Sequence, residues 1–258
     1  MEITPLVLTY NEAPNIERTL SRLTWASRIV VVDSFSTDET EAICRRDPRV
    51  EFIQRKFEDH TTQWNFGLAQ IKTEWVLTLD ADYVLSDGFL NELRNWNPAA
   101  GLNAYFASFK YCVHGRQLRG SLYPPRAVLL RHARGRYVSD GHTQKLKIEG
   151  ASGSLASFID HDDRKPLSHW LQSQDRYAVL EVTKLLASDP SRLRFQDRLR
   201  RKIVFAPWLV FFYTLLGKGL VLDGWPGWHY VLQRTLAEII LSLRLVEARL
   251  GPKSGDGR

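Results

Sequence analysis

The sequence predicts an α/β fold with a largely parallel sheet, on the strength of three observations. Apolar, β-branched stretches alternate with stretches of helical spacing through the first half of the chain. The stretch at 28–34 reads RIVVVDS and is apolar up to a terminal acid, as in buried parallel strands. A chain of 258 residues with 44% hydrophobic and 25% charged residues can bury a core, and it resembles neither a disordered tail nor a disulfide scaffold.

The elements follow in order along the chain. Strands are expected at 3–10, 28–34, 50–54 and 74–81. Helices are expected at 15–23, 36–44, 61–71 and 166–188. Ser36 or Thr37 is expected to cap the second helix. Residues 100–165 are rich in Arg, His and Gly, and they are predicted to form loops and short strands that close over a site.

The carboxyl ends of the predicted strands indicate where a ligand binds. In parallel α/β sheets ligands lie beyond these ends. The polar residues found there are Asn11, Glu12, Asp33, Ser34, Asp80 and Asp82. The first two strand ends are expected to lie side by side, and Asp33 could accept hydrogen bonds from a ribose or a base imide. The alternative role for Asp33 is a helix cap. The sequence has neither GxGxxG nor GxxxxGK[ST], which argues against a dinucleotide-binding protein and an ATPase.

The strongest chemical signal is VLTLDAD at 76–82. Its two carboxylates, one residue apart at the end of an apolar strand, can both reach one divalent cation. Hard oxygen ligands suit Mg²⁺ or Mn²⁺, which would then bridge to a diphosphate. The alternative is a solvated turn.

The last quarter of the chain has a different character and is expected to form a second domain, 191–258, after a first domain at 1–190. Residues 192–258 carry 12 Lys/Arg and 5 Asp/Glu, a net charge of +7, whereas the remainder carries 23 and 24, a net charge of −1. A basic run at 192–202 leads into fourteen uncharged residues at 203–216. Fourteen residues are too few to cross a bilayer, which needs about 20.

Arginines beside an aromatic, apolar segment match a helix lying in the headgroup layer of an anionic membrane. The alternative is a core helix packed on the sheet, and consecutive aromatics argue against nucleic acid. An aromatic turn is expected at 224–228, and a final amphipathic helix at 229–250. The N-terminus shows no secretory signal pattern, and Cys44 and Cys112 are expected to be free thiols.

Four stretches in the first half, LTYNE, IVVVDSFSTDET, QWNFGL and WVLTLDAD, resemble family 2 glycosyltransferases with the GT-A fold, a Rossmann-like mixed sheet flanked by helices. Later stretches at 115–116, 123–126, 129–132, 140–144 and 159–165 resemble the branch of lipopolysaccharide-core β-1,4-glucosyltransferases. The resemblance covers about residues 3–185 and, more loosely, the tail.

The resemblance implies a role for individual positions. Residues implied to hold the nucleotide sugar are Thr9, Asn11, Glu12, Asp33, Asn65, Asp80 and Ala81. Residues implied to hold the metal are Asp80, Asp82 and His161, although His161 could instead be an ordinary hydrogen-bonded histidine. The general base is expected to be Asp140, with His142 second and a turn-forming role as the alternative for Asp140. The branch often has His-Glu where this chain has His142-Thr143, which leaves the base open.

Three arginines, Arg116, Arg126 and Arg131, are expected to bind diphosphate or acceptor phosphate, because the guanidinium fork matches phosphate geometry. The alternative is that they are solvated surface residues. These features, together with the resemblance, predict an inverting, metal-dependent hexosyltransferase that uses Mg²⁺ or Mn²⁺. The resemblance implies a UDP-glucose-like donor. Its acceptor would be a lipid-linked glycan such as lipopolysaccharide core, at the cytoplasmic face of a bacterial inner membrane. The alternatives are a polyprenyl-phosphate glycosyltransferase and a non-catalytic membrane-surface protein with a degenerate site.

Overall fold

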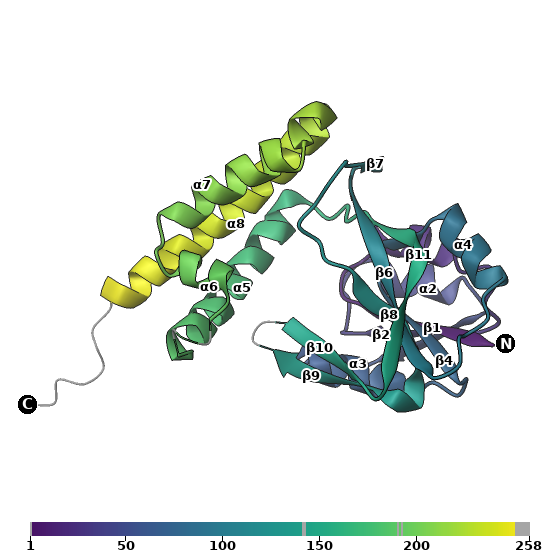
Figure 1. Ribbon diagram of the computed structural model, residues 1–258. Helices are drawn as coiled ribbons and strands as arrows, with labels where there is room; N and C mark the ends of the chain where they lie inside the picture. The colour runs from purple at the N-terminus through teal and green to yellow at the C-terminus, as the bar shows by residue number, and fades with distance from the viewer. Residues whose placement is uncertain (1, 141–142, 190, 192, 251–258) are drawn as a thin grey trace, which may run out of the picture. The chain divides into compact units, whose positions relative to one another are not determined.

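The computed structural model describes residues 2–140, 143–189, 191 and 193–250, with the side chains of residues 140 and 143 outside this description (Figure 1). The chain divides into two compact units, Met1–Lys165 and Pro166–Arg258. The first is an α/β unit and the second is helical.

The first unit is built on one large mixed sheet with the strand order β3-β2-β1-β4-β8-β6-β11-β5. Its strands are β1 (Ile3–Thr9), β2 (Ile29–Asp33), β3 (Val50–Gln54), β4 (Trp75–Asp80), β5 (Tyr83–Leu85), β6 (Leu102–Val113), β8 (Arg126–Arg131) and β11 (Ala151–His161). Strands β1 to β4 pair in parallel, whereas β8 runs antiparallel to both β4 and β6. A short strand, β7 (Arg116–Gln117), pairs with β6, and β9 (Gly135–Asp140) pairs with β10 (Thr143–Ile148) as a separate hairpin. The predicted α/β class is confirmed.

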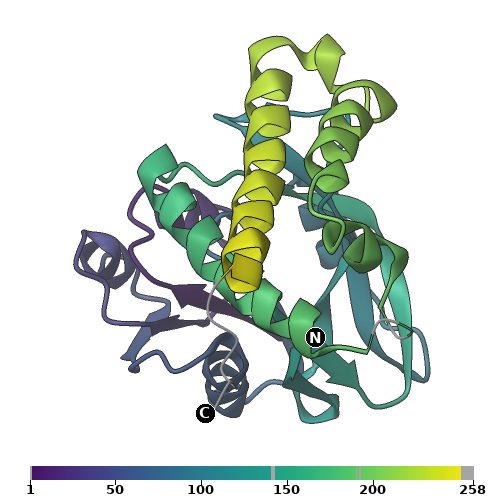
Figure 2. The ribbon, with the colours of Figure 1, turned by 90° about the vertical axis from the view of Figure 1, so that its left-hand side faces the viewer.

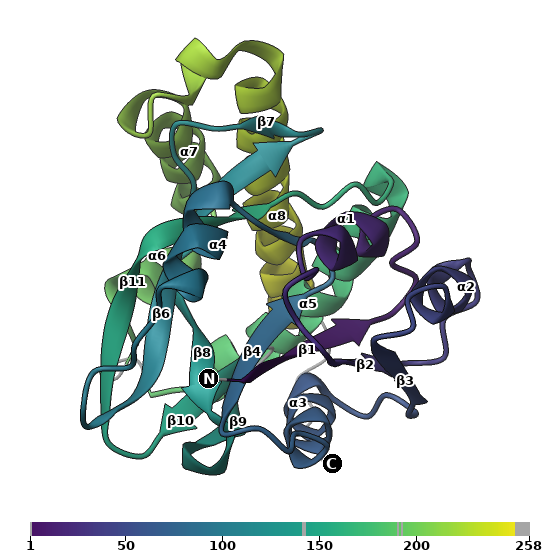
Figure 3. The ribbon, with the colours of Figure 1, turned by 90° about the vertical axis from the view of Figure 1, so that its right-hand side faces the viewer.

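The two faces of the sheet are covered by different elements. The helices of the first unit are α1 (Ile16–Ser21), α2 (Thr40–Arg45), α3 (His60–Ala69) and α4 (Asp87–Arg94). Adjacent strand residues point to opposite faces, so Val7 packs with α1, α2 and α4 while Leu6 packs with α3 and the β9–β10 hairpin. Figure 3 shows α1 and α3 on opposite sides of β1 and β4. Both layers are apolar, and Cys44 and Cys112 are buried free thiols.

Two local predictions were wrong, the second only in part. The second helix begins at Thr40 rather than Ser36, because residues 34–38 hydrogen-bond to the loop after β1 instead. The middle of the chain contains the expected short strands, β7 to β10, but it also contains two long strands that were not expected. β6 has 12 residues and β11 has 11, and they pair in parallel. The polar and small residues that suggested loops occupy the exposed positions of these long, half-buried strands.

The second unit contains α5 (Leu167–Ala187), α6 (Phe195–Arg200), α7 (Phe205–Phe212), a π-helical turn η3 (Tyr213–Gly217), a 3₁₀ turn η4 (Leu220–Asp223) and α8 (Gly224–Leu250). Figure 2 shows α8, in yellow, between α5 and α7. The predicted aromatic turn at 224–228 is in fact the first turn of α8, where Pro226 needs no N–H partner.

The helix α5 belongs to the helical unit by its packing. Val182 and Leu185 of α5 form a buried cluster with Leu241 and Leu245 of α8. The two compact units therefore divide after Lys165, whereas the sequence places the domain boundary after residue 190.

Within the described ranges, no single helix is both long and apolar enough to cross a membrane. One pair, Phe205–Gly217 with Leu220–Leu250, satisfies length and composition together but is bent by 67°.

Candidate functional site

The carboxyl ends of β1 and β2 lie side by side, as predicted. Thr9 and Asp33 are register partners, and the Thr9 hydroxyl donates a hydrogen bond of 2.8 Å to Asp33 Oδ1. Asp33 is fully buried. Its carboxylate also accepts from Ser36, from the hydroxyl at 2.5 Å and from the backbone N–H at 2.8 Å. Both oxygens of Asp33 therefore bind protein groups, and the residue anchors the loop rather than presenting a free acceptor.

Asn11 connects the same two loops. Its backbone N–H donates to the Ser36 hydroxyl at 2.8 Å, and its side-chain oxygen accepts from the Thr37 N–H at 2.8 Å. Asn11 and Phe35 both have left-handed backbone conformations, with φ of 52° and 61°. Such conformations are costly for a bulky residue and persist where surrounding bonds fix them. The Asp33–Ser36 and Asn11–Thr37 bonds do so here.

Three exposed aromatic residues follow the first three strands, and sequence reasoning did not single them out. Tyr10, Phe35 and Phe57 are 47%, 52% and 43% exposed and follow β1, β2 and β3 respectively. Large aromatic side chains are normally mostly buried. Their position after three parallel strands is a sequence signal that could have identified them. Tyr10 and Phe35 also belong to the two loops held by Asp33.

Glu12 is buried beside these loops and forms an ion pair of 2.6 Å with Lys165 Nζ. Its second oxygen accepts from the Asn15 amide at 2.8 Å. Burial raises the pKa of Glu12 to about 7; the charge of Asp82 adds to this shift and that of Lys165 opposes it. The sequence indicated Glu12 but not Lys165, which is 153 positions away.

The segment after β11 is held against α1. Arg18 binds the Asp162 carboxylate at 2.6 Å and its carbonyl at 2.7 Å. The Asn15 amide donates to Asp163 at 2.9 Å, and the Asp162 N–H donates to the Asp82 carbonyl at 3.0 Å. These bonds fix the end of β11 next to the residues that follow β4.

His161 and Asp82 are brought together, as the sequence implied. His161 Nε2 lies 3.1 Å from Asp82 Oδ2. Burial opposes ionisation of both groups, but the charge of each group favours the ionised form of the other. The pKa of Asp82 is therefore lowered and that of His161 is raised. Asp82 Oδ1 and His161 Nδ1 are buried and have no hydrogen-bond partner among the described residues. Asp80 ends β4 nearby, and the buried Ala81 offers its carbonyl to Thr19 at 2.6 Å.

A divalent cation fits the chemistry of this group in part. Two carboxylates and an imidazole suit Mn²⁺ or Mg²⁺, and the unpartnered Asp82 oxygen is a ready ligand. Over the residues that the structure describes, no three His, Cys, Asp or Glu side chains are arranged closely enough to hold a metal. The predicted metal ligands thus include suitable donor types, but among the described residues they do not form an assembled coordination shell.

Tyrosines surround His161. The rings of Tyr83, Tyr111 and Tyr123 lie 5.5, 4.9 and 4.4 Å from its ring. Tyr83 and Tyr123 hydrogen-bond through their hydroxyls, and Arg126 stacks over Tyr123 at 5.0 Å. Burial opposes the charge of Arg126, but the two tyrosines and Asp80 raise its pKa above the ordinary value. Arg126 therefore lies at the site, as expected.

The remaining predicted residues are spread more widely. Arg131 is not at the site: it pairs with Trp75 at the start of β4, stacks on that ring and binds Glu74, about 17 Å of strand from Asp80. The antiparallel direction of β8 places Arg126 at the site and Arg131 away from it. Asn65 instead holds the backbone of Tyr137, at 3.0 and 2.9 Å. Arg116 is exposed on β7.

The predicted bases cannot be placed. Asp140 ends β9, but its side chain lies outside the described residues, as does the whole of His142.

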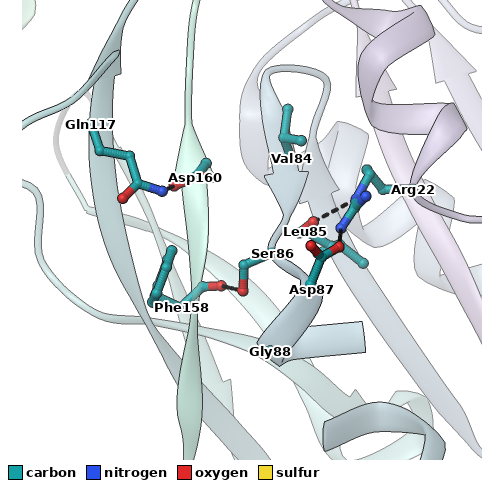
Figure 4. Close-up of a pocket in the computed structure, with 9 residues that line it drawn as sticks. All are labelled: Arg22, Val84, Leu85, Ser86, Asp87, Gly88, Gln117, Phe158 and Asp160. Carbon is teal, nitrogen blue, oxygen red and sulfur yellow. Dashed lines mark hydrogen bonds and ion pairs between the residues drawn. The ribbon is translucent and has the colours of Figure 1, made fainter. Parts of the chain in front are cut away.

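A shallow pocket of about 430 Å³ lies beside β5 (Figure 4). Arg22, Ser86, Asp87, Gln117 and Asp160 are among the residues lining it. Its polar groups are already paired, Gln117 with Asp160 at 2.8 Å and Arg22 with Asp87. None of the predicted site residues that the structure describes lines this pocket, so it is separate from the site at the strand ends.

The chain is similar in sequence to known glycosyltransferases. The sequence model described as "Glycosyl transferase family 2" matches residues 6–165. The lipopolysaccharide core biosynthesis glycosyltransferase LpsC of Rhizobium meliloti (strain 1021) is 23% identical over 249 residues, which is 88% of this chain and 85% of LpsC. An uncharacterized glycosyltransferase of Rickettsia bellii (strain RML369-C) is 26% identical over 145 residues; the match spans 55% of this chain and about half, 49%, of that relative.

Among solved structures, the mannosyltransferase PcManGT from Pyrobaculum calidifontis, in complex with GDP-Man and Mn²⁺, superposes with a TM-score of 0.55. It is 16% identical, and the alignment covers 96% of this chain and 88% of PcManGT. This likeness supports the fold.

Proposed function

The chain belongs to glycosyl transferase family 2, and we propose that it transfers a hexose from a nucleotide-diphosphate sugar to a lipid-linked glycan. The proposal depends on one observation: two loops and two carboxylates lie at the same edge of the sheet. The loops anchored by Asp33 and Asn11 follow β1 and β2, and Asp80 and Asp82 follow the neighbouring β4. Donor nucleotide and diphosphate would therefore lie across adjacent strand ends.

The donor half of the site is formed by loops rather than by a glycine-rich turn. Thr9, Asn11 and Asp33 hold the loop backbones in place, and the exposed faces of Tyr10 and Phe35 are available for stacking on a base. The choice of a UDP-glucose-like donor rests on the resemblance to the lipopolysaccharide-core branch. PcManGT, solved with GDP-Man, is the reason to test guanine nucleotides beside uracil ones.

A bound Mg²⁺ or Mn²⁺, held by Asp80 and Asp82 with His161, would supply positive charge against the departing diphosphate. Arg126 would add a fixed cation on the same side. In an inverting transfer the acceptor oxygen attacks the anomeric carbon, its proton passes to a base and the nucleotide diphosphate leaves. We assign the base to Asp140, and a well-placed base contributes roughly 10²–10⁴-fold in rate.

Calorimetry with UDP-glucose and GDP-mannose, each with and without Mn²⁺, tests the donor site. We expect one nucleotide sugar to bind saturably only with Mn²⁺, and Asp82→Asn to weaken binding at least about tenfold. Asp87→Asn is the matched control, because its carboxylate is 94% exposed and pairs only at the surface with Arg22. If neither donor binds in the presence of metal, the proposal fails.

The acceptor is proposed from the relative LpsC, a lipopolysaccharide core glycosyltransferase, and the location from the basic C-terminal quarter, which suits the cytoplasmic face of an inner membrane. Turnover with lipid-linked core oligosaccharide is the direct assay. Asp140→Ala should abolish it if a sugar hydroxyl is the acceptor. Retained activity in this variant would instead favour a polyprenyl phosphate, which needs no base.

A further inference from the structure

We propose that one face of α7 and the turns after it insert into the interfacial layer of an anionic bilayer, without crossing it. We call this surface the apolar face, and it consists of Val204, Phe205, Trp208, Leu209, Phe212, Tyr213, Leu216, Val221, Leu222 and Trp225. The inference names the lipid-contacting residues and rests on the proposed function only for the identity of the acceptor.

The apolar face reverses the usual pattern of a surface helix. Helices of soluble proteins direct polar residues outward, but the exposed positions of α7 recur at helical spacing and are all apolar or aromatic. Phe205, Trp208 and Leu216 are 61%, 64% and 63% exposed, and Trp225 in the first turn of α8 is 86% exposed. On its packed side α7 buries Ala206, and the π turn after it buries Thr214 and Leu215. Contiguous apolar patches on this scale mark interaction surfaces.

The charges around the apolar face select lipid as its partner. Residues 203–217 contain no charged side chain, and the chain on either side supplies cations. Arg194, Arg198 and Lys202 precede it and are exposed. Lys218 follows, with its ammonium 5.5 Å from the centre of the Tyr213 ring. Tryptophan, tyrosine and lysine at the margin of an apolar surface are typical of the membrane–water boundary, where cations meet lipid phosphates.

The same residues argue against a spanning helix. The uncharged stretch is shorter than the about 20 residues that a bilayer requires. The continuation through α8 is bent by 67° and carries Arg234, Glu238 and Arg244. Glu238 is buried in an ion pair of 2.6 Å with Arg200, which fixes that part of α8 within the helical unit. A helix that lies at the membrane interface can bury the apolar face in lipid and leave these charged residues outside the hydrocarbon layer.

Co-sedimentation with vesicles tests the surface in the full-length protein. We expect binding to vesicles of phosphatidylcholine mixed with phosphatidylglycerol, and weaker binding to phosphatidylcholine alone. The double substitution Trp208→Glu with Phe212→Glu should reduce the partition coefficient at least about 100-fold, because it removes two aromatic side chains that would enter the lipid and adds two negative charges that an anionic surface repels. Leu186→Glu on α5 is the matched control, since Leu186 is 48% exposed, is not part of the apolar face and should change binding little.

Nitroxide labels measure depth directly. Labels on Trp208→Cys and Leu216→Cys should become accessible to oxygen dissolved in lipid, whereas a label on Leu186→Cys should stay in water; the native Cys44 and Cys112 are buried. Three outcomes would overturn the proposal: labels that remain in water, a lipid-free dimer that the double substitution dissociates, and full-length protein that resists carbonate extraction as a spanning protein does. Vesicle binding needs no nucleotide sugar and donor binding needs no lipid, so either proposal can fail while the other stands.

Discussion

Asp33 shows how a single buried carboxylate organises the two loops that follow β1 and β2. It accepts hydrogen bonds from Thr9 and Ser36, and its oxygens are closed to solvent. We predict that Asp33→Asn lowers the free energy of unfolding by about 1–3 kcal/mol, because one of the two oxygens becomes an amide nitrogen that cannot accept. With the nitrogen at the Oδ2 position, the hydrogen bond from the Ser36 N–H is lost. Nucleotide-sugar affinity should fall with it, since Phe35 and Ser36 lose their fixed positions.

Urea unfolding and calorimetry together measure the two effects of Asp33→Asn. Asp38→Asn is a useful companion, because Asp38 also accepts backbone hydrogen bonds, from Ala13 and Thr40, but lies further out along the same loop. A variant at Asp33 that keeps full stability and full affinity would show that the loop is held by other contacts.

Glu12 gives a prediction for pH. Burial raises the pKa of Glu12 from an ordinary 4.5 to about 7, so the folded chain binds this proton more tightly than the unfolded chain. The stabilisation from protonation is complete below the unfolded pKa and disappears as pH rises towards about 7. We therefore expect Glu12 to contribute a fall in stability across that window, and Glu12→Gln to remove this contribution.

The measurement is the free energy of unfolding of both proteins at about pH 5 and about pH 8. Glu12→Gln leaves Lys165 unpaired and lowers stability throughout, so the difference between the two pH values is the informative quantity. Glu58→Gln, at a side chain that is 64% exposed, is the control. An unchanged pH difference in Glu12→Gln would contradict the assigned shift.

At the residue scale, sequence reasoning correctly predicted which residues at the strand ends lie close together. Thr9 with Asp33 and Asp82 with His161 are adjacent, as expected. Sequence reasoning failed for partners that are distant in sequence. The residues around Lys165 do not indicate that it binds Glu12, and those around Arg18 do not indicate that it binds Asp162. Sequence reasoning also misplaced Arg131, because the direction of β8 cannot be derived from its own residues.

At the element scale, α3 approaches β1 closely enough to require a glycine. A Cβ on Gly67 would lie 2.7 and 2.9 Å from the terminal carbons of Leu6, which is fully buried. We predict that Gly67→Ala destabilises the fold by up to about 2 kcal/mol, because overpacking costs roughly 1–3 kcal/mol and the higher helix propensity of alanine recovers about 1 kcal/mol.

Thermal and urea unfolding of Gly67→Ala should be compared with Gly88→Ala. Gly88 lies in the first turn of α4, and the nearest atom to its new Cβ is the Ser157 hydroxyl at 3.3 Å, which can rotate away. This control should be as stable as the native chain or more so. An equal loss of stability in both variants would mean that the close contact with Leu6 does not cause the destabilisation of Gly67→Ala.

The elements themselves were predictable to different degrees. The parallel strands β1, β2, β3 and β4 have strong apolar runs, and all four were expected. The length of strands β6 and β11 was missed because many of their exposed or half-buried positions carry serine, glycine, lysine and asparagine. Their strand state depends on pairing with each other, which is a tertiary contact that periodicity does not report.

At the scale of the whole molecule, the candidate site residues and the excess positive charge lie in different parts of the chain. Every described residue assigned to the site lies within Met1–Lys165. The excess of positive charge lies in residues 192–258, with a net of +7 against −1 for the remainder. The sequence predicted this charge division, but it placed α5 with the first part because the packing of α5 on α8 is not visible locally.

This separation predicts that the first unit works alone as a donor-binding protein. A fragment of residues 1–165 keeps both apolar layers of the sheet, the Asp33 loop and the Glu12–Lys165 pair. We expect it to unfold cooperatively and to bind the nucleotide sugar with Mn²⁺ at an affinity close to that of the full chain. It should not sediment with phosphatidylglycerol vesicles, because it lacks the basic residues and the apolar face of α7. A folded fragment without donor affinity would instead show that the helical unit supplies part of the donor site.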